Sequence, residues 1–366
     1  MMSEERFLLK DFFNPASIGV IADAVQKAEP RFDRRAFLDS VFDGDWEGRQ
    51  LKQRMRHVAQ SLRDALTEDY RSALSVLVDA ATDAKEAGFA AMVFSDFVEA
   101  FGVHDFEASV AALEVFTKNV SAEFAVRPFL IAYPVRMLDQ MLVWAVDENA
   151  AVRRLASEGT RPRLPWGIAL KSYQADPTPL FPLLETLCHD PSGDVRRSVA
   201  NSLNDISKEH PDLVVDLLAR WQDGSEEVAE ITKHALRTLL KQGHAGALSL
   251  LGFNPDPNVE ILDLKVDQCS VQVGGKVSVS FTVRSTSHEH QSVMIDGVVE
   301  YARARGASTK VFKWKTTGLG PGEDLSISRS ISLRPTSTRR VIPGAHGCQI
   351  QVNGTRLARI DFEVVE

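Results

Sequence analysis

Residues 147–171, DENAAVRRLASEGTRPRLPWGIALK, decide the fold of this chain. An acidic turn leads into Val152-Arg153-Arg154, and the same order returns at Val195-Arg196-Arg197. A weaker copy begins at Val228, so the copies are 43 and 33 residues apart. Periods of this length, with paired helices, are typical of HEAT-like units stacked as an α-solenoid. The valines are expected to face the core.

Helical periodicity extends from Phe7 to about Gly252. Asn14 and Pro15 have the types preferred at an N-cap and at the first helical position. Apolar residues then recur at helical spacing, and no β-alternation interrupts them. We therefore predict that residues 1–253 form the solenoid.

The pattern changes at Asn254-Pro255-Asp256-Pro257, where two prolines stop the helices. Residues 277–283, VSVSFTV, then alternate with period two, as a half-buried strand does. Seven or so short strands are expected after the linker, residues 254–258, among them residues 259–266 and 310–315. No paired-cysteine signature accompanies them. Residues 259–366 are therefore predicted to form an immunoglobulin-like β-sandwich, in a chain that is otherwise mainly α.

Charge is divided unevenly along the chain. Residues 1–256 have a net charge of −11 (28 basic, 39 acidic), and residues 257–366 have +3 (14 basic, 11 acidic). The net negative charge argues weakly against bulk nucleic-acid binding. It does not exclude a local basic groove, because the electrostatic field that a nucleic acid meets is local. Cys188, Cys269 and Cys348 lack metal-ligand or redox spacing, so we expect buried free thiols in a reducing cytoplasm.

Carboxylates and an indole gather around the end of the first repeat. Glu158 ends a predicted helix, where the helix dipole disfavours a negative charge. Glu158 lies six residues after its repeat valine and Asp205 lies ten after its own. The difference of four is one helical face, so the two carboxylates can converge in stacked repeats. Glu123, Glu158 and Asp205 each stand four to six residues before a proline that is expected to open the next helix, namely Pro128, Pro162 and Pro211. Trp166 follows Pro165.

Basic residues near these carboxylates form a candidate track for DNA phosphates, since cations on successive repeats can follow a nucleic-acid backbone. They are Arg127, Arg153, Arg154, Arg161, Arg163, Lys171, Arg196 and Arg197. Each of these residues also has a structural alternative. The arginine pairs could be solvated helix surface, the indole could lie in the core, and the acids could be helix caps or surface residues.

No catalytic triad, zinc site, P-loop or dinucleotide loop is recognisable, so neither a metal nor a cofactor is expected. No apolar run reaches the roughly 18 residues of a membrane span, so no membrane contact is expected.

Five segments carry a family resemblance: residues 9–13 (LKDFF), 51–56 (LKQRMR), 123–130 (EFAVRPFL), 152–159 (VRRLASEG) and 204–207 (NDIS). With them the chain resembles the HEAT-repeat DNA alkylation-repair glycosylases, and the AlkC branch rather than AlkD. The resemblance covers the solenoid and extends to the appended sandwich. It implies removal of cationic bases, notably 3-methyladenine and, in AlkC, 3-methylcytosine. It also implies acidic site residues Glu123, Glu158 and Asp205, with Trp166 as the aromatic one. The aromatic–Asp–aromatic arrangement of AlkD is not recognisable.

The chemistry of these residue types agrees with that activity. A cationic base is already a good leaving group, so carboxylates need only stabilise the positive sugar or orient a water. An indole face can contact the cation. No lysine nucleophile stands among the motifs, because Lys171 is assigned to phosphate, and this favours hydrolysis over Schiff-base chemistry.

We therefore expect a monofunctional DNA glycosylase that acts as a monomer on duplex DNA with alkylated bases. It is expected in the cytoplasm, at the nucleoid when bound to DNA. The sandwich could clasp the duplex through Arg303, Arg305, Lys310, Lys313, Arg339 or Arg340. The alternative is a non-enzymatic HEAT-repeat scaffold or adaptor for a protein partner, which has no need for acids among phosphate-binding cations.

Overall fold

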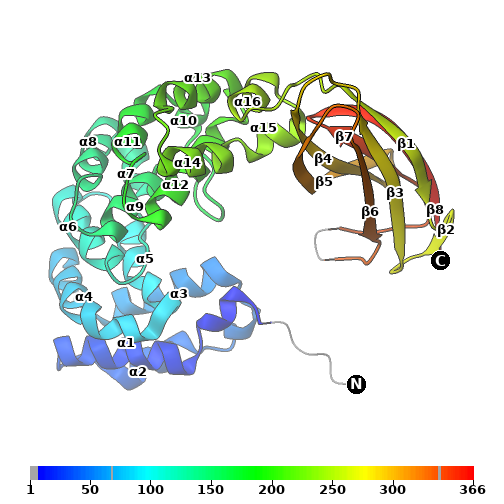
Figure 1. The fold of residues 1–366 in the computed structure, drawn as a ribbon. Helices are drawn as coiled ribbons and strands as arrows, with labels where there is room; N and C mark the ends of the chain where they lie inside the picture. Colours follow the sequence, from blue (N-terminus) through cyan, green and yellow to red (C-terminus); the bar gives the residue numbers. More distant parts are fainter. Residues whose placement is uncertain (1–6, 67–68, 337–338) are drawn as a thin grey trace. The chain divides into compact units, whose positions relative to one another are not determined.

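The computed structural model describes residues 7–66, 69–336 and 339–366 (Figure 1). Helices precede strands along the chain, as the sequence predicts. The α-helices are α1 (Pro15–Ala28), α2 (Arg34–Val41), α3 (Leu51–Ala65), α4 (Tyr70–Ala84), α5 (Met92–Phe101), α6 (Phe106–Thr117), α7 (Arg127–Ala132), α8 (Pro134–Trp144), α9 (Ala150–Gly159), α10 (Lys171–Ala175), α11 (Phe181–Thr186), α12 (Gly193–Ile206), α13 (Pro211–Trp221), α14 (Glu226–Ala235), α15 (Arg237–Gln242) and α16 (Ala245–Leu250). Short 3-10 helices are η1 (Leu9–Phe12), η2 (Trp46–Gly48), η3 (Lys85–Ala91) and η4 (Thr178–Leu180).

Contacts divide the chain into two compact units. The first comprises Met1–Glu209 with Asp223–His234, and the second comprises His210–Gln222 with Ala235–Glu366. The helices thus end near the predicted position, while α13, α15 and α16 belong to the same unit as the strands. The domain limits 1–253 and 259–366 stay a prediction.

Local sequence signals explain the helices of the first unit. The Asn14 side chain accepts hydrogen bonds from the backbone N–H groups of Ala16 and Ser17, which satisfies the start of α1. The repeat valines Val152 and Val195 are fully buried, as predicted for residues that face the core. Helices α9 and α12, which carry the two copies of Val-Arg-Arg, contact each other (Figure 1).

The expected start of a helix soon after Pro162 is wrong. Residues 160–170 form a loop, and α10 begins only at Lys171. A residue that precedes proline is disfavoured in the helical region, and both Arg161 and Leu164 precede one. This loop carries Trp166.

The strands of the second unit form two sheets. They are β1 (Val259–Val266), β2 (Ser270–Gln272), β3 (Lys276–Ser285), β4 (Gln291–Ala302), β5 (Ala307–Leu319), β6 (Asp324–Ser332), β7 (Gly344–Val352) and β8 (Thr355–Val365). One sheet has the order β1-β3-β6 and the other β2-β8-β7-β4-β5; β2 pairs with β8 in parallel and the other pairs are antiparallel. Alternate residues of β3 are buried, and both sheets contribute to one apolar core, as in a β-sandwich.

Two glycines fix the turn between β7 and β8 against the end of α15. Gly243 and Gly354 both have positive φ, and a Cβ on Gly354 would lie 2.1 Å from the Cα of Gly243. Nearby, the Asn353 side chain donates to the backbone oxygen of Asn254 over 2.9 Å. The strands and the last helices therefore pack closely within the second unit.

Two further expectations concern the surface of the chain. Cys188 and Cys348 are buried free thiols as predicted, but Cys269 is exposed because it lies in the turn before β2. None of the helices in the described ranges is both long and apolar enough to cross a membrane.

Candidate functional site

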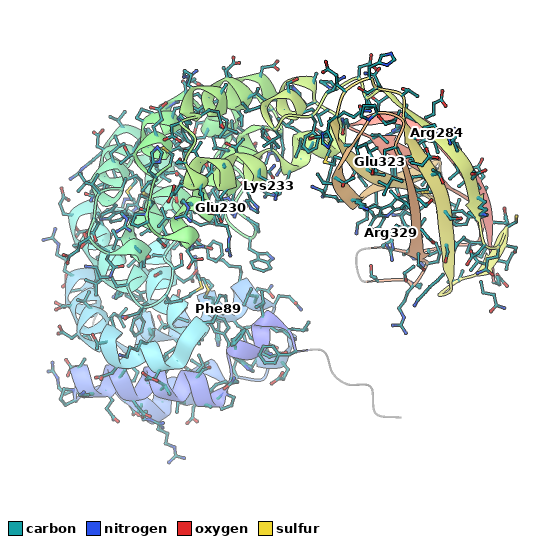
Figure 2. The ribbon with its side chains drawn as sticks, in the orientation of Figure 1. Phe89, Glu230, Lys233, Arg284, Glu323 and Arg329 are labelled. Atoms are coloured by element: carbon teal, nitrogen blue, oxygen red, sulfur yellow. The ribbon has the colours of Figure 1, made fainter. Side chains whose placement is uncertain are left out.

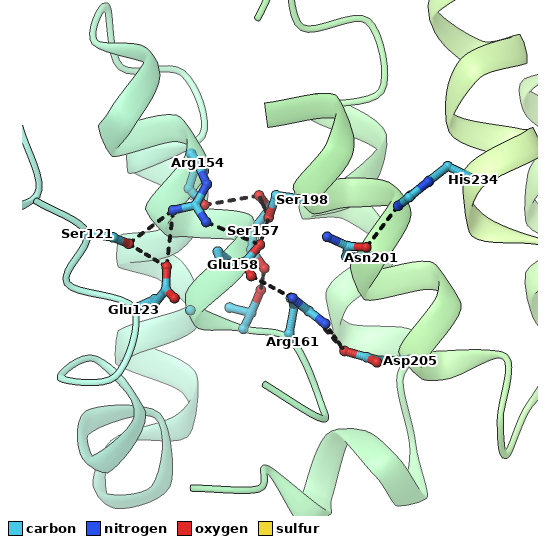
Figure 3. A network of polar contacts seen from close by, with 12 residues as sticks. Ser121, Glu123, Arg154, Ser157, Glu158, Arg161, Ser198, Asn201, Asp205 and His234 are labelled. Atoms are coloured by element: carbon cyan, nitrogen blue, oxygen red, sulfur yellow. Dashed lines mark hydrogen bonds and ion pairs between the residues drawn. The ribbon is translucent and has the colours of Figure 1, made fainter. Parts of the chain in front are cut away.

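Arg161 brings the two predicted carboxylates together (Figure 3). Its Nη1 donates to Oε1 of Glu158 over 2.6 Å, and its Nε donates to Oδ2 of Asp205 over 2.9 Å. Glu158 lies near the end of α9 and Asp205 near the end of α12. The two carboxylates therefore meet on one guanidinium, as the offset of four residues along stacked repeats predicts.

Glu123 joins the same network from the turn between α6 and α7, rather than from the end of an inner helix. Its Oε2 accepts from Ser121 over 2.6 Å and from Nη1 of Arg154 over 3.1 Å. Nη2 of Arg154 lies 3.9 Å from Oε2 of Glu158. Arg154 thus connects the first carboxylate to the second.

The result is an alternating row of charges across the first unit. It consists of Glu123, Arg154, Glu158, Arg161, Asp205 and Lys208. Nζ of Lys208 donates to Oδ1 of Asp205 over 3.1 Å and ends the row. The side chains of Glu158 and Asp205 are almost inaccessible, so each depends on these partners to offset the loss of hydration.

Arg127 is fully buried, close enough to this row to feel the charges of its members. Its Nη1 donates to the backbone oxygen of Gly159 over 2.9 Å, and its Nε donates to that of Ile168. Within the described ranges its Nη2 has no hydrogen-bond partner. Burial, and next the charge of Arg161, lower the pKa of Arg127 to about 10. Arg127 therefore fastens both ends of the loop that carries Trp166.

Trp166 is exposed on that loop, so it is not a core residue. Trp166 has 63% of its surface exposed to solvent, and its backbone φ is +60°. A left-handed backbone costs an L-residue roughly 1–2 kcal/mol and is retained only where the surroundings impose it. Backbone hydrogen bonds from Gly167 to Leu164 and from Leu170 to Pro162 hold the turn. The loop is thus built to present an indole to solvent.

Two of the predicted phosphate-binding arginines instead link the repeats. Arg153 binds both carboxylate oxygens of Asp190, at 2.6 and 3.0 Å. Arg196 occupies the equivalent position in the next repeat and contacts Glu230 at 2.9 Å. Each also donates to backbone oxygens of the turn before its own helix. These contacts give the repeated arginine a role in stacking.

The remaining predicted cations are open to solvent. Arg163, Lys171 and Arg197 are exposed, and Arg163 pairs with Glu209. Lys233 on α14 is also exposed and lies on the same helix as Glu230 (Figure 2). Sequence patterns did not single out Lys233, because the third repeat lacks the arginine pair.

Three polar partners of the carboxylates were also missed. Ser121, Ser198 and Lys208 each bond to one of them. Lys208 follows Asp205 by three residues at a helix end, so its spacing could have indicated the contact. A serine carries no such signal. In the described part of the chain, no group of three or more histidine, cysteine or acidic side chains could hold a metal ion.

A repeat unit that holds carboxylates between arginines, followed by an immunoglobulin-like sandwich, is the architecture that the sequence resemblance implies. The family model described as DNA alkylation repair enzyme matches residues 49–239, and the model described as the C-terminal Ig-like domain of the uncharacterised protein YhaZ matches residues 260–366. The chain belongs to the family of DNA alkylation repair enzymes.

Two relatives match almost the whole chain. The chain is similar to the alkylpurine DNA glycosylase AlkC of Pseudomonas fluorescens, solved bound to DNA containing an abasic site analog. That match has 38% identity and a TM-score of 0.94 and covers 98% of this chain and 100% of the other. The chain is also 39% identical over 357 residues to the uncharacterized protein YhaZ of Bacillus subtilis (strain 168), and this match covers 97% of this chain and 99% of that protein. These matches confirm the predicted family and fold class.

Proposed function

We propose that this chain is a monofunctional DNA glycosylase for cationic alkylated bases in duplex DNA. It hydrolyses the N-glycosidic bond of 3-methyladenine and, as a second substrate, of 3-methylcytosine. The observation that carries the proposal is the pair Glu158 and Asp205, held on Arg161 beside an exposed Trp166. The similar AlkC structure contains DNA with an abasic site analog, which resembles the product of such a reaction.

The carboxylates stabilise positive charge on the deoxyribose as the bond to the base breaks. The alkylated base is already cationic while it is attached to the sugar. It takes the electron pair of the breaking bond and leaves as a neutral molecule, so no proton needs to be delivered to it. Glu158 and Asp205 are fixed by charged hydrogen bonds, so little reorganisation is needed when the charge develops. Glu123 adds a third negative group, and Trp166 contacts the cationic base or the sugar through its π face.

Hydrolysis is favoured over Schiff-base chemistry because the amine of Lys208, next to Asp205, is held in an ion pair. Lys208 donates to Asp205 over 3.1 Å, and an ammonium that is paired in this way is a poor nucleophile. Lys171 is exposed in α10 and is assigned to phosphate.

Exposed cations hold the DNA backbone in this proposal. They are Arg163, Lys171, Arg197 and Lys233, while Arg127, Arg153, Arg161 and Arg196 serve the site and the repeat stack. The protein works as a monomer in the cytoplasm and at the nucleoid when it is bound to DNA. The scaffold alternative does not account for the paired carboxylates.

Incubation with methylated duplex DNA tests the proposal. Released bases are separated by chromatography, abasic sites are counted after alkaline cleavage, and borohydride trapping is run in parallel. We expect free 3-methyladenine, abasic sites in unbroken strands and no trapped protein. Release no greater than that of Glu158→Gln/Asp205→Asn would refute the glycosylase assignment, and a trapped covalent complex would refute the hydrolytic mechanism.

A further inference from the structure

We infer that Ser198 is a positioning residue for Glu158, and that Ser157 supports it through a short chain of hydroxyl groups. The inference rests on the proposed function, because it assigns Glu158 a role in base excision. It concerns the oxygen of Glu158 that Arg161 does not hold.

The two oxygens of Glu158 are held by different donors (Figure 3). Oε1 accepts from Arg161, and Oε2 accepts from the hydroxyl of Ser198 over 2.7 Å. The guanidinium of Arg154 is farther from Oε2, at 3.9 Å. Ser198 is therefore the close partner that sets the rotation of the carboxylate about its last bond.

Ser157 continues the chain. Its hydroxyl lies 2.7 Å from that of Ser198, and 3.1 Å from the backbone oxygen of Arg154. Ser157 and Ser198 are both buried, so these contacts are shielded from water. Low polarity strengthens such contacts, and hydrogen bonds in series polarise one another.

The direction of the chain is set by the state of Glu158. An ionised carboxylate only accepts, so Ser198 must donate to it, and Ser157 then donates to Ser198. A protonated Glu158 would donate to Ser198, which would turn the hydroxyl of Ser157 towards the backbone oxygen of Arg154. With Glu158 ionised, the hydroxyl of Ser157 thus makes its shorter contact, the one to Ser198.

The chain also connects the carboxylate to the repeat stack. Glu158 and Ser157 belong to α9, while Ser198 belongs to α12. A change in the spacing of these helices would therefore move the donor that holds Oε2. This places the orientation of Glu158 under the control of the packing between the two repeats.

Ser198→Ala tests the role, with Ser202→Ala as its matched control. Ser202 lies one turn farther along α12 and is equally buried, and its hydroxyl has no hydrogen-bond partner in the described part of the chain. Both variants remove one buried oxygen, but only the first removes a donor to Glu158. Ser157→Ala is the intermediate case, because it leaves the bond from Ser198 to Glu158.

The variants are compared by single-turnover excision of 3-methyladenine at saturating protein, by the Kd for DNA with an abasic site analog, and by Tm. We expect a loss of rate of about tenfold for Ser198→Ala, about twofold to threefold for Ser157→Ala, and none for Ser202→Ala. The Kd should stay within twofold in all three.

Two results would overturn the inference: equal rates for Ser198→Ala and Ser202→Ala, or a rate loss in Ser198→Ala that is matched by an equal loss of DNA affinity or of folded protein. Failure of the proposed function is distinguishable, since wild-type protein would then release no base. If Ser198→Ala does not fold, the comparison of Ser157→Ala with Ser202→Ala decides the matter, and equal rates there would also reject it.

Discussion

Arg161 and Asp205 are 44 residues apart in sequence, yet Nη2 of the first lies 2.9 Å from Oδ2 of the second. The same guanidinium binds Glu158, which is only three residues before it. One buried cation thus joins a local carboxylate to a distant one. Neither acid can be changed without altering the surroundings of the other.

Neutral replacement of these carboxylates should separate catalysis from folding. We expect Glu158→Gln and Asp205→Asn each to slow single-turnover excision by about 10²–10³-fold, since each removes a fixed charge that faces the developing cation. DNA affinity should change little. The measurements are excision rate, Kd and the free energy of unfolding for each protein. Full activity per folded molecule would show that the acids are structural.

The double variant Glu158→Gln/Asp205→Asn should lose more stability than the two single variants together. Each single variant leaves Arg161 one carboxylate, whereas the double variant leaves a buried guanidinium without either. Residues that share a partner are expected to be non-additive by about 0.5–3 kcal/mol. Urea unfolding of the four proteins measures the coupling, and strict additivity would contradict the shared role of Arg161.

Loss of the exposed indole should impair excision without unfolding the protein. Trp166→Ala removes a side chain that is largely in solvent, so the free energy of unfolding should change by less than about 1 kcal/mol. The excision rate should fall by tenfold or more. Trp144→Ala is the control, because Trp144 is fully buried and its loss should cost about 3–5 kcal/mol. A Trp166→Ala protein with the wild-type rate would remove this residue from the site.

Local patterns predicted the elements well because their causes are local. The N-cap at Asn14 and the alternation in β3 depend only on neighbours in sequence, and the strand predicted over Val259 to Val266 has the same bounds as β1. The strand predicted over residues 310–315 is longer, since β5 continues by pairing with β4 where its own sequence is polar.

The site was predictable only in part. Repeat spacing predicted that Glu158 and Asp205 meet, because both lie on the same face of equivalent helices. The partners of the arginines were not predictable, since Arg153 finds Asp190 and Arg196 finds Glu230 more than thirty residues away. Whether an arginine faces a phosphate or a carboxylate depends on such distant contacts, and no local pattern contains them.

The stability of the sandwich should depend on pH through Asp296. Burial raises the pKa of this carboxyl from its ordinary value of 3.8 to about 6, while the charge of Lys313 opposes the shift. The folded protein therefore holds a proton that the unfolded chain releases. The contribution of this proton binding to the free energy of unfolding is fully present below about pH 4 and is lost as the pH rises through about 6.

Asp296→Asn removes this titration. The free energy of unfolding of the variant minus that of wild type should rise between pH 4 and pH 7 by up to about 3 kcal/mol, and level off above. Urea unfolding at several pH values measures the difference, in which the titration of all other groups cancels. If the difference in the free energy of unfolding between variant and wild type stays constant with pH, the pKa of Asp296 is not raised by burial.

The enzyme should excise cationic adducts such as 3-methyladenine far better than neutral bases such as uracil or hypoxanthine. Expelling a neutral base requires a proton or a strong hydrogen bond delivered to it, and hence a positioned acid. Glu158 and Asp205 accept hydrogen bonds from Arg161, Ser198 and Lys208. Carboxylates held by such donors attract a cation but have no proton to give.

Trp166 should increase this discrimination, since a π face prefers a cationic partner by roughly 0.5–2 kcal/mol. The measurement is a side-by-side single-turnover assay on duplexes that carry one lesion each in the same sequence. Trp166→Ala serves as the matched comparison, and its rate should fall more on 3-methyladenine than on any neutral base. Comparable rates of the wild-type protein on uracil and on 3-methyladenine would mean that a general acid acts in this site.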